Sequence, residues 1–167
     1  MKFKNLGFTL IELLVVISII GILAGMVVVS FTSSQKQARD TARKSDLTQY
    51  RTSLETYANK NNGLFPVYTT STAVSGSVCA TVNTSLGATT SCPEDPKYAS
   101  DNTYLQYQYQ SNGSGAVGTA GASDYVLWAR LENVTNMLWV SCSTGESGKI
   151  SSLTSISGGT CPSGLTP

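Results

Sequence analysis

The hydrophobic pattern divides the chain into an apolar N-terminal block, an amphipathic middle segment and a polar remainder. The stretch from Leu13 to Val29 contains no charged residue, and residues 8–31 are apolar apart from Glu12 and a few hydroxyl side chains. A helix needs about 20 mainly apolar residues to cross a bilayer. The pattern therefore predicts a hydrophobic, membrane-spanning helix over residues 8–34.

The helical pattern continues into a polar segment over residues 35–61. Apolar side chains recur there at spacings of three and four residues, which is typical of one buried helix face: Leu47, Tyr50, Leu54, Tyr57 and Ala58. Gly63 and Pro66 then end the helix. We therefore predict one helix from residue 8 to residue 61, about 80 Å long. Its apolar stripe should pack under a sheet of the same chain, and its charged residues between Lys36 and Arg51 should form a solvated face.

Beyond the helix, the chain becomes a series of short extended segments, residues 105–110, 125–131 and 137–142. In the first, Leu105, Tyr107 and Tyr109 alternate with glutamines. Such segments predict β-strands, and connections of this size favour an antiparallel meander. We predict an α+β fold: a connecting loop region (residues 62–103) wraps the surface, and a head (residues 104–167) packs a sheet of about three strands, followed by a C-terminal tail, against the helix.

Four cysteines lie in the polar part of the chain, and there is no histidine. An even number of cysteines downstream of an export segment favours disulfides over a metal site. Four cysteines allow three pairings, of which we favour the sequential one, Cys79 with Cys92 and Cys142 with Cys161. The absence of histidine removes the commonest general base, and a net charge of +1 gives no signal for nucleic acid. We therefore expect neither an enzyme nor a specific nucleic-acid partner.

Glu12 is an exception within the apolar block. A carboxylate in the middle of a membrane costs about 2.5 kcal/mol or more, although less near the interface, so it requires a partner. Cleavage of the chain after Gly7 would create a positively charged amine on Phe8, one helical turn before Glu12. The amine of the same chain or of a neighbouring chain would then pair with the carboxylate.

The residues around Glu12 form a specific motif. Gly7-Phe8-Thr9-Leu10-Ile11-Glu12-Leu13 follows a short basic leader and precedes the apolar run. This arrangement resembles the processing site of type IV pilins and of type II secretion pseudopilins. The resemblance implies the pilin fold, removal of residues 1–7 by a prepilin peptidase and N-methylation of Phe8. It also implies that Glu12 guides polymerisation through the helix of residues 8–34.

The same resemblance implies a structural role and a set of partners. The chain would be a single-pass membrane protein before assembly and part of an extracellular pilus afterwards, with a role in adhesion, motility or DNA uptake. Its partners would be further copies of itself, other pilins, the prepilin peptidase, the pilus assembly platform and the membrane. The alternative is a major pseudopilin of a type II secretion system.

One departure from the family pattern concerns the apolar helix. Filament-forming members often carry a proline late in this helix, and this chain has none there. Gly21 and Gly25 are its weakest points, since glycine costs about 1 kcal/mol relative to alanine inside a helix. Local melting during filament packing is expected between them. The missing proline favours a pseudopilin, whereas the disulfides and the long loop rich in serine and threonine favour a pilin.

The pattern G-x-G-x-x-G occurs at residues 113–118. A dinucleotide site requires a helix that begins at these glycines, but a strand-like segment follows them here. We therefore predict a loop.

A short loop offers carboxylate oxygens at Glu94, Asp95 and Asp101. Calcium is a candidate ligand because major pseudopilins as a group bind it in a comparable loop. The spacing fits no EF-hand, and a Pro-Glu-Asp-Pro turn explains the acids without a metal. We expect no cofactor, with calcium as the alternative.

Overall fold

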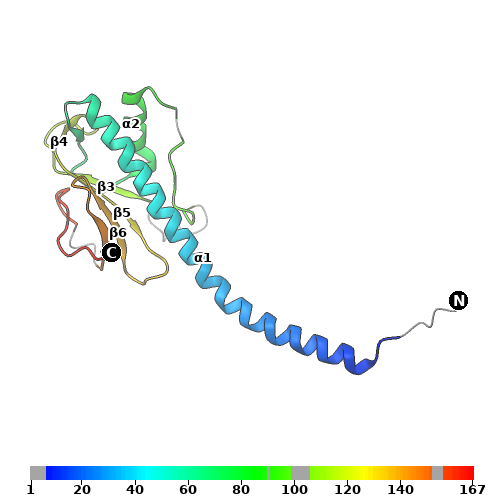
Figure 1. Cartoon of the computed structure of the whole chain (residues 1–167). Coiled ribbons are helices and arrows are strands. Elements are labelled where there is room, and N and C mark those ends of the chain that lie inside the picture. The colour runs from blue at the N-terminus through cyan, green and yellow to red at the C-terminus, as the bar shows by residue number, and fades with distance from the viewer. Residues whose placement is uncertain (1–6, 90, 99–105, 152–155) are drawn as a thin grey trace.

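A computed structural model describes residues 7–89, 91–98, 106–151 and 156–167 of the chain. It shows a long N-terminal helix and a head formed by the remaining elements (Figure 1). Helix α1 (Leu10–Lys60) contains 51 residues, which corresponds to a length of about 77 Å. Its first half projects away from the head as a stem, and its second half lies along the head (Figure 1). The predicted continuous helix is confirmed.

Local sequence signals set both ends of α1. Thr9 has an extended backbone, and its side chain caps the first turn. At the other end, Asn62 and Gly63 have φ angles of 56° and 79°, and the amide of Gly63 donates a hydrogen bond to the carbonyl of Ala58. A left-handed turn of this kind ends a helix, and glycine adopts it without steric cost.

The head contains a five-stranded antiparallel sheet in the order β2–β3–β5–β6–β7. Its strands are β2 (Thr72–Ala73), β3 (Gln108–Ser111), β5 (Tyr125–Arg130), β6 (Leu138–Cys142) and β7 (Ser147–Ile150). A two-stranded sheet pairs β1 (Phe65–Pro66) with β4 (Ala120–Ala122). The three predicted strands correspond to β3, β5 and β6, so the α+β fold is confirmed and the sheet is larger than expected. Residue 105, where the first predicted strand begins, lies outside the described residues.

The large sheet is buried on both faces. Tyr109 and Leu127 belong to the core under α1, together with the predicted apolar stripe of that helix: Leu47, Tyr50, Leu54, Tyr57 and Ala58. A second core surrounds Trp128 and Val140 and packs against Leu165 of the C-terminal tail. Because each face has its own cover, β5 is buried along nearly its whole length.

Part of the segment predicted as a surface loop is helical. Helix α2 (Cys79–Leu86) follows a π-helical turn, η1 (Val74–Val78), and ends at Gly87, whose φ is 65°. Val78 and Val82 are buried in the core shared with α1. The expectation of an irregular loop is wrong here, because burial of this apolar face outweighs the weak helix propensity of threonine and asparagine.

Residues 113–118 form an irregular connection between β3 and β4, as predicted. A Cβ atom at Gly113 would lie 2.6 Å from the carbonyl oxygen of Gly121 and 2.7 Å from the amide nitrogen of Ala122. Close packing of the backbone therefore explains this glycine without a phosphate site.

Candidate assembly site and head–stem junction

The proposed processing site lies at the end of the stem that is remote from the head. Gly7 and Phe8 precede α1 in a non-helical segment, and Phe8 is 87% exposed. A Cβ atom placed on Gly7 would meet no described atom within 4 Å. The peptide bond between Gly7 and Phe8 is therefore open to a second protein.

Glu12 forms a capping box with Thr9. The amide and the hydroxyl of Thr9 donate hydrogen bonds to Oε2 of Glu12 at 2.9 Å and 2.7 Å, and the amide of Glu12 donates to Oγ1 of Thr9 at 3.3 Å. These bonds satisfy amides that otherwise lack partners in the first helical turn. The carboxylate also lies at the positive end of the helix dipole. In the single subunit, Glu12 is thus held by the start of its own helix.

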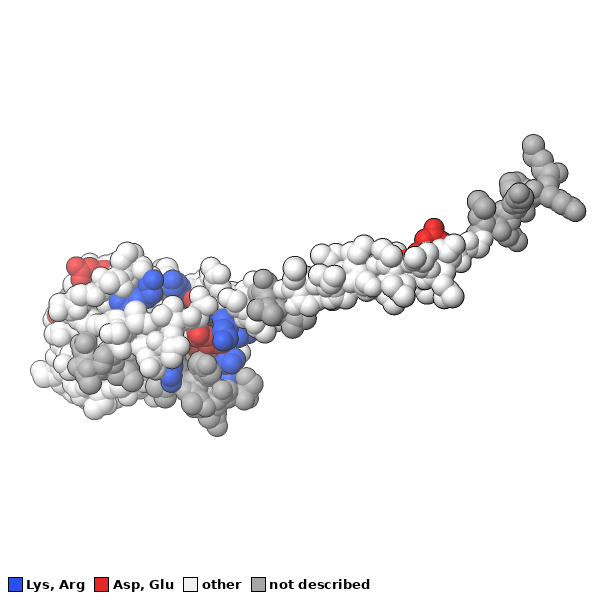
Figure 2. All heavy atoms as spheres, turned by 90° about the horizontal axis from the view of Figure 1, so that it is seen from below, with Lys and Arg blue, Asp and Glu red and all other residues white. Residues whose placement is uncertain are grey.

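The stem presents a continuous apolar surface. All side chains from Leu10 to Met26 are exposed, and Glu12 is the only charged residue among them. Figure 2 shows the stem as an uncharged rod with one acidic group near its end. Among the described residues, α1 is the one helix that is long and apolar enough to span a membrane. Such a surface must be covered by lipid or by other helices.

Gly21 and Gly25 do not interrupt the stem, since α1 is helical through both. A Cβ atom at either position would meet nothing within 4 Å. The single subunit therefore gives no packing reason for glycine at these two positions. Local melting between them stays a proposal about the assembled filament.

A buried ion network lies where the stem joins the head. Arg43 is fully buried, so the solvated face predicted for residues 36–51 is wrong at this position. The guanidinium of Arg43 donates two hydrogen bonds to Asp95, at 2.6 and 2.9 Å, one to Asp40 at 2.7 Å and one to Glu132 at 2.6 Å. These carboxylates compensate the charge that burial removes from water.

The network connects α1 to two other segments of the head. Glu132, between β5 and β6, also accepts hydrogen bonds from Arg39 at 2.9 and 2.8 Å and lies 3.6 Å from Nζ of Lys97. Asp40 accepts from the amides of Glu132 and Asn133, both at 2.9 Å. Hydrogen bonds from Arg39, together with the bonds and charge of Arg43, lower the pKa of Glu132 to about 2 against the opposing effect of burial. The stem is therefore fixed to the head by paired charges.

The calcium candidate falls on residues of this network. Both carboxylate oxygens of Asp95 accept hydrogen bonds from Arg43, whereas Glu94 is exposed. Asp101 lies outside the described residues. Within the described ranges, no group of three or more histidine, cysteine, aspartate or glutamate residues could hold a metal ion. Arg43 occupies the position beside Asp95 that a cation would take.

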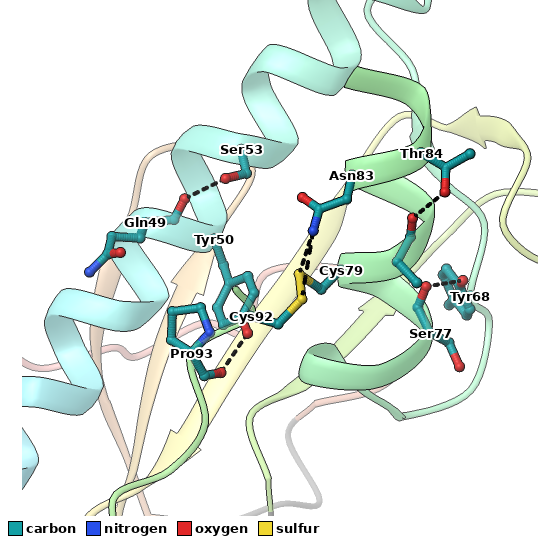
Figure 3. Close-up of a disulfide and its surroundings, with 11 residues drawn as sticks. Gln49, Tyr50, Ser53, Tyr68, Ser77, Cys79, Asn83, Thr84, Cys92 and Pro93 are labelled. Carbon is teal, nitrogen blue, oxygen red and sulfur yellow. Dashed lines mark hydrogen bonds between the residues drawn. A yellow bond between two sulfur atoms is a disulfide. The ribbon is translucent and has the colours of Figure 1, made fainter. Parts of the chain in front are cut away.

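A disulfide joins Cys79, at the start of α2, to Cys92, as the sequence analysis favoured. A cleft of about 160 Å³ lies beside it between α1 and α2. Figure 3 shows Tyr50 on one side of this cleft and Asn83 on the other, with Asn83 pointing at the disulfide. The hydroxyl of Tyr50 donates a hydrogen bond to the carbonyl of Pro93. These contacts fix the segment that carries Asp95 against the stem helix.

The second disulfide joins Cys142, at the end of β6, to Cys161 in the C-terminal tail. The tail also pairs with β7, since Lys149 and Thr166 exchange backbone hydrogen bonds of 2.6 and 3.0 Å. The Cys142–Cys161 bond is the second disulfide that the sequence analysis favoured. Together these bonds hold the tail over the second core of the sheet.

Comparison with known families places the N-terminal geometry in context. Residues 2–28 match a family model described as the prokaryotic N-terminal methylation motif. The chain carries the prepilin-type signature of type IV pilins and pseudopilins. No curated protein and no solved structure matches the chain. The prepilin signature supports a pilin- or pseudopilin-like filament subunit, and it implies processing by a prepilin peptidase and assembly with other pilins. With the apolar stem, it fits membrane anchoring before assembly.

Two features of the sites described above were not predicted from the sequence. Thr9 could have been found, because Thr-x-x-Glu is the local pattern of a capping box. The network around Arg43 had no such signal, since its partners Asp95 and Glu132 lie 52 and 89 residues away along the chain.

Proposed function

We propose that the chain is the structural subunit of a type IV pilus-like extracellular filament, stored in the cytoplasmic membrane and polymerised through its stem. The observation that supports this most strongly is the apolar stem, whose side chains from Leu10 to Met26 are all exposed, with a single carboxylate beside the proposed cleavage site, in a chain with the prepilin signature. Lipid covers the stem before assembly, and the stems of neighbouring copies cover it in the filament. The heads then face outward, and the subunit needs no catalytic activity of its own.

Glu12 would supply the register of the assembled stems. Cleavage after Gly7 leaves a charged amine on Phe8, and methylation of that amine keeps its charge. In an apolar bundle an unpaired carboxylate is costly. Each incoming stem is therefore stabilised at the axial position where its Glu12 meets a Phe8 amine. Before assembly, the capping bonds from Thr9 hold the same carboxylate.

A pseudopilin of a type II secretion system is the second candidate. The same signature begins proteins of both classes, and the stem of this chain lacks proline. A pilus extends from the cell surface, whereas a pseudopilus stays in the periplasm. Electron microscopy of cells labelled with an antibody to the head would show long surface fibres for a pilin and only a periplasmic species for a pseudopilin.

Two substitutions test the processing and assembly roles. Gly7→Ala should leave the precursor uncut, which is visible in the mass of the N-terminal peptide. Glu12→Gln keeps the size of the side chain and removes its charge, so the chain should be processed normally. The filament yield of Glu12→Gln should fall by more than about tenfold, which corresponds to a loss of about 1.4 kcal/mol or more per subunit added.

The matched control is Glu146→Gln, since this carboxylate is exposed on the head. It should leave both processing and the yield of sheared filaments unchanged. Wild-type yield from Glu12→Gln would refute the role of this carboxylate in assembly.

A further inference from the structure

One flank of α1 carries a group of basic side chains. Lys44 and Arg51 are seven residues apart on the same side of the helix, a separation of about 10 Å. Nζ of Lys44 lies 4.0 Å from the centre of the Trp139 ring, and Lys149 on β7 is paired in register with Trp139. Arg51 donates a hydrogen bond of 3.4 Å to the carbonyl of Gly145. We call Lys44, Arg51 and Lys149 the basic flank. Figure 2 shows Lys and Arg atoms in separate patches on the head.

The cations of the basic flank pair with no carboxylate in the part of the chain that the structure describes. All three side chains are partly exposed, and within the described ranges none forms an ion pair, in contrast to Arg39, Arg43 and Lys97. Glu55 follows Arg51 by one helical turn, and Glu146 follows Gly145, so three cations outnumber the two carboxylates beside them. The flank therefore carries an excess of positive charge.

The opposite flank of the same helix carries an excess of negative charge. Asp46 follows Lys44 by two residues, a rotation of about 200° around the helix axis. Its carboxylate accepts a hydrogen bond of 2.6 Å from the hydroxyl of Tyr107. Glu94 is exposed in the adjacent segment. The hydroxyl of Tyr50 donates a hydrogen bond to the carbonyl of Pro93, the residue before Glu94, so Glu94 lies on the same side of α1 as Tyr50. Burial raises the pKa of Tyr50, and the negative charges of Asp46 and Glu94 raise it further. We call Asp46 and Glu94 the acidic flank.

The charges of the neighbouring ion network do not neutralise the acidic flank. Among the described residues, the network contains the cations of Arg39, Arg43 and Lys97 and the carboxylates of Asp40, Asp95 and Glu132, and these six charges balance one another. Asp46 and Glu94 therefore remain in excess on this side of the helix.

We propose that in the filament the basic flank of one subunit contacts the acidic flank of a second copy. The proposal rests on the proposed filament function. The two flanks lie on opposite sides of one helix at similar height, so they cannot meet within one subunit. A two-fold symmetric dimer would bring like charges together, whereas a head-to-tail contact pairs opposite charges and leaves one flank free at each end. Such heterologous contacts produce open helical assemblies.

A second copy fits the basic flank better than a polyanion such as nucleic acid. The complementary acidic surface is on the same chain, and the chain as a whole has a net charge of only +1, which gives weak attraction for a polyanion. Exposed ion pairs are individually weak and screened by salt, so these contacts set the orientation of neighbouring heads while the apolar stems supply most of the stability.

Cross-linking of intact filaments tests the contact. A water-soluble carbodiimide forms an amide between a carboxylate and a lysine amine that touch, so wild-type filaments should give a ladder of oligomers on a denaturing gel. Peptide mapping should identify bonds from Lys44 or Lys149 to Asp46 or Glu94. Glu94→Gln should weaken the ladder, and Lys44→Gln combined with Lys149→Gln should abolish it. Lys60→Gln is the matched control, because Lys60 is exposed at the far end of α1, and it should preserve the ladder.

A charge exchange tests the same contact by function. Lys149→Glu should lower filament yield severalfold at low ionic strength, and adding Glu94→Lys should restore it, whereas Lys60→Glu should have no effect. Equal amounts of membrane-stored subunit in all variants show that each one folds.

Three results distinguish the possible failures. Filaments that contain no bond between the two flanks would overturn the proposal and leave the filament function intact. Lysines of the basic flank that are protected by added oligonucleotide, without bonds between subunits, would show that this flank binds a polyanion instead. A wild-type chain that enters no filament would refute the proposed function itself.

Discussion

Replacement of Arg43 by methionine should destabilise the head more than any comparable change on α1. Arg43 is fully buried, and Arg43→Met keeps the length of the side chain but removes its charge and its hydrogen bonds. The three carboxylates that Arg43 contacts differ in the hydrogen-bond donors that they keep after this substitution. Glu132 retains Arg39, and Asp40 retains two backbone amides. Among the described residues, Asp95 retains only the amide of Lys97, at 2.8 Å.

The loss of unfolding free energy follows from Asp95, whose carboxylate would stay buried without a cationic partner. The Asp95 side chain is 1% exposed, and removal of one partner from a buried ion pair costs about 3 to 5 kcal/mol. That is a large share of a total free energy of unfolding of about 5 to 15 kcal/mol. At about 4 °C per kcal/mol, the melting temperature should fall by roughly 10 to 20 °C.

Near-ultraviolet circular dichroism of the full chain in detergent micelles measures this effect in the head alone. All eight tyrosines and both tryptophans lie at or beyond Tyr50, so the signal is insensitive to melting of the stem. Arg51→Met is the matched control, because Arg51 is partly exposed and makes one hydrogen bond. Its effect should stay within about 0.5 kcal/mol.

The double variant Arg43→Met with Asp95→Asn completes the test. If Arg43→Met is destabilising because it leaves the Asp95 carboxylate buried without a cation, Asp95→Asn should recover at least about half of the lost stability. Equal melting temperatures for Arg43→Met and Arg51→Met, or no recovery in the double variant, would refute this reasoning.

Three further predictions concern the same head. The pKa of Glu132 is about 2 in the folded chain, below its ordinary value of 4.5. Its stabilising effect is therefore complete above about pH 4.5 and is lost as the pH falls toward 2. Glu132→Gln should lower the melting temperature at neutral pH, and the remaining stability should depend less on pH in this range than in the wild type. Loss of the Cys142–Cys161 bond through two serine substitutions should cost about 3 kcal/mol. It should also make Trp128 accessible to acrylamide, because the tail would no longer cover the second core. Unchanged quenching of tryptophan fluorescence would show that the tail stays in place without the disulfide. Excess calcium followed by chelator should leave the wild-type melting temperature unchanged, since Arg43 engages both oxygens of Asp95. A rise with calcium would show a site that includes other ligands.

The sequence was sufficient for the features that depend on near neighbours. The uncharged run and the spacing of Leu47, Tyr50 and Leu54 predicted α1 because helical periodicity is a local property. The short extended segments beyond the helix likewise predicted β3, β5 and β6. The motif from Gly7 to Glu12 is also local, and it carries the resemblance that the family model supports.

Features that depend on distant segments could not be read from the sequence in the same way. Helix α2 has a weak intrinsic preference for helix, and the burial of Val78 and Val82 against the core decides its structure. Arg43 has an ordinary position in a charged stretch, but residues 52 and 89 positions later bury it. The edge strands β2 and β7 were not predicted because they are short. They add to a sheet whose central strands, β3, β5 and β6, were predicted.

Electron cryomicroscopy of filaments from cells that produce this chain would show whether the stem forms the filament core. We expect a core of packed α1 stems that begins at a processed Phe8, with each Glu12 beside a Phe8 amine and the heads on the outside. Filaments that lack this chain, or that contain it with the stem outside the core or with residues 1–7 still attached, would refute the proposed function.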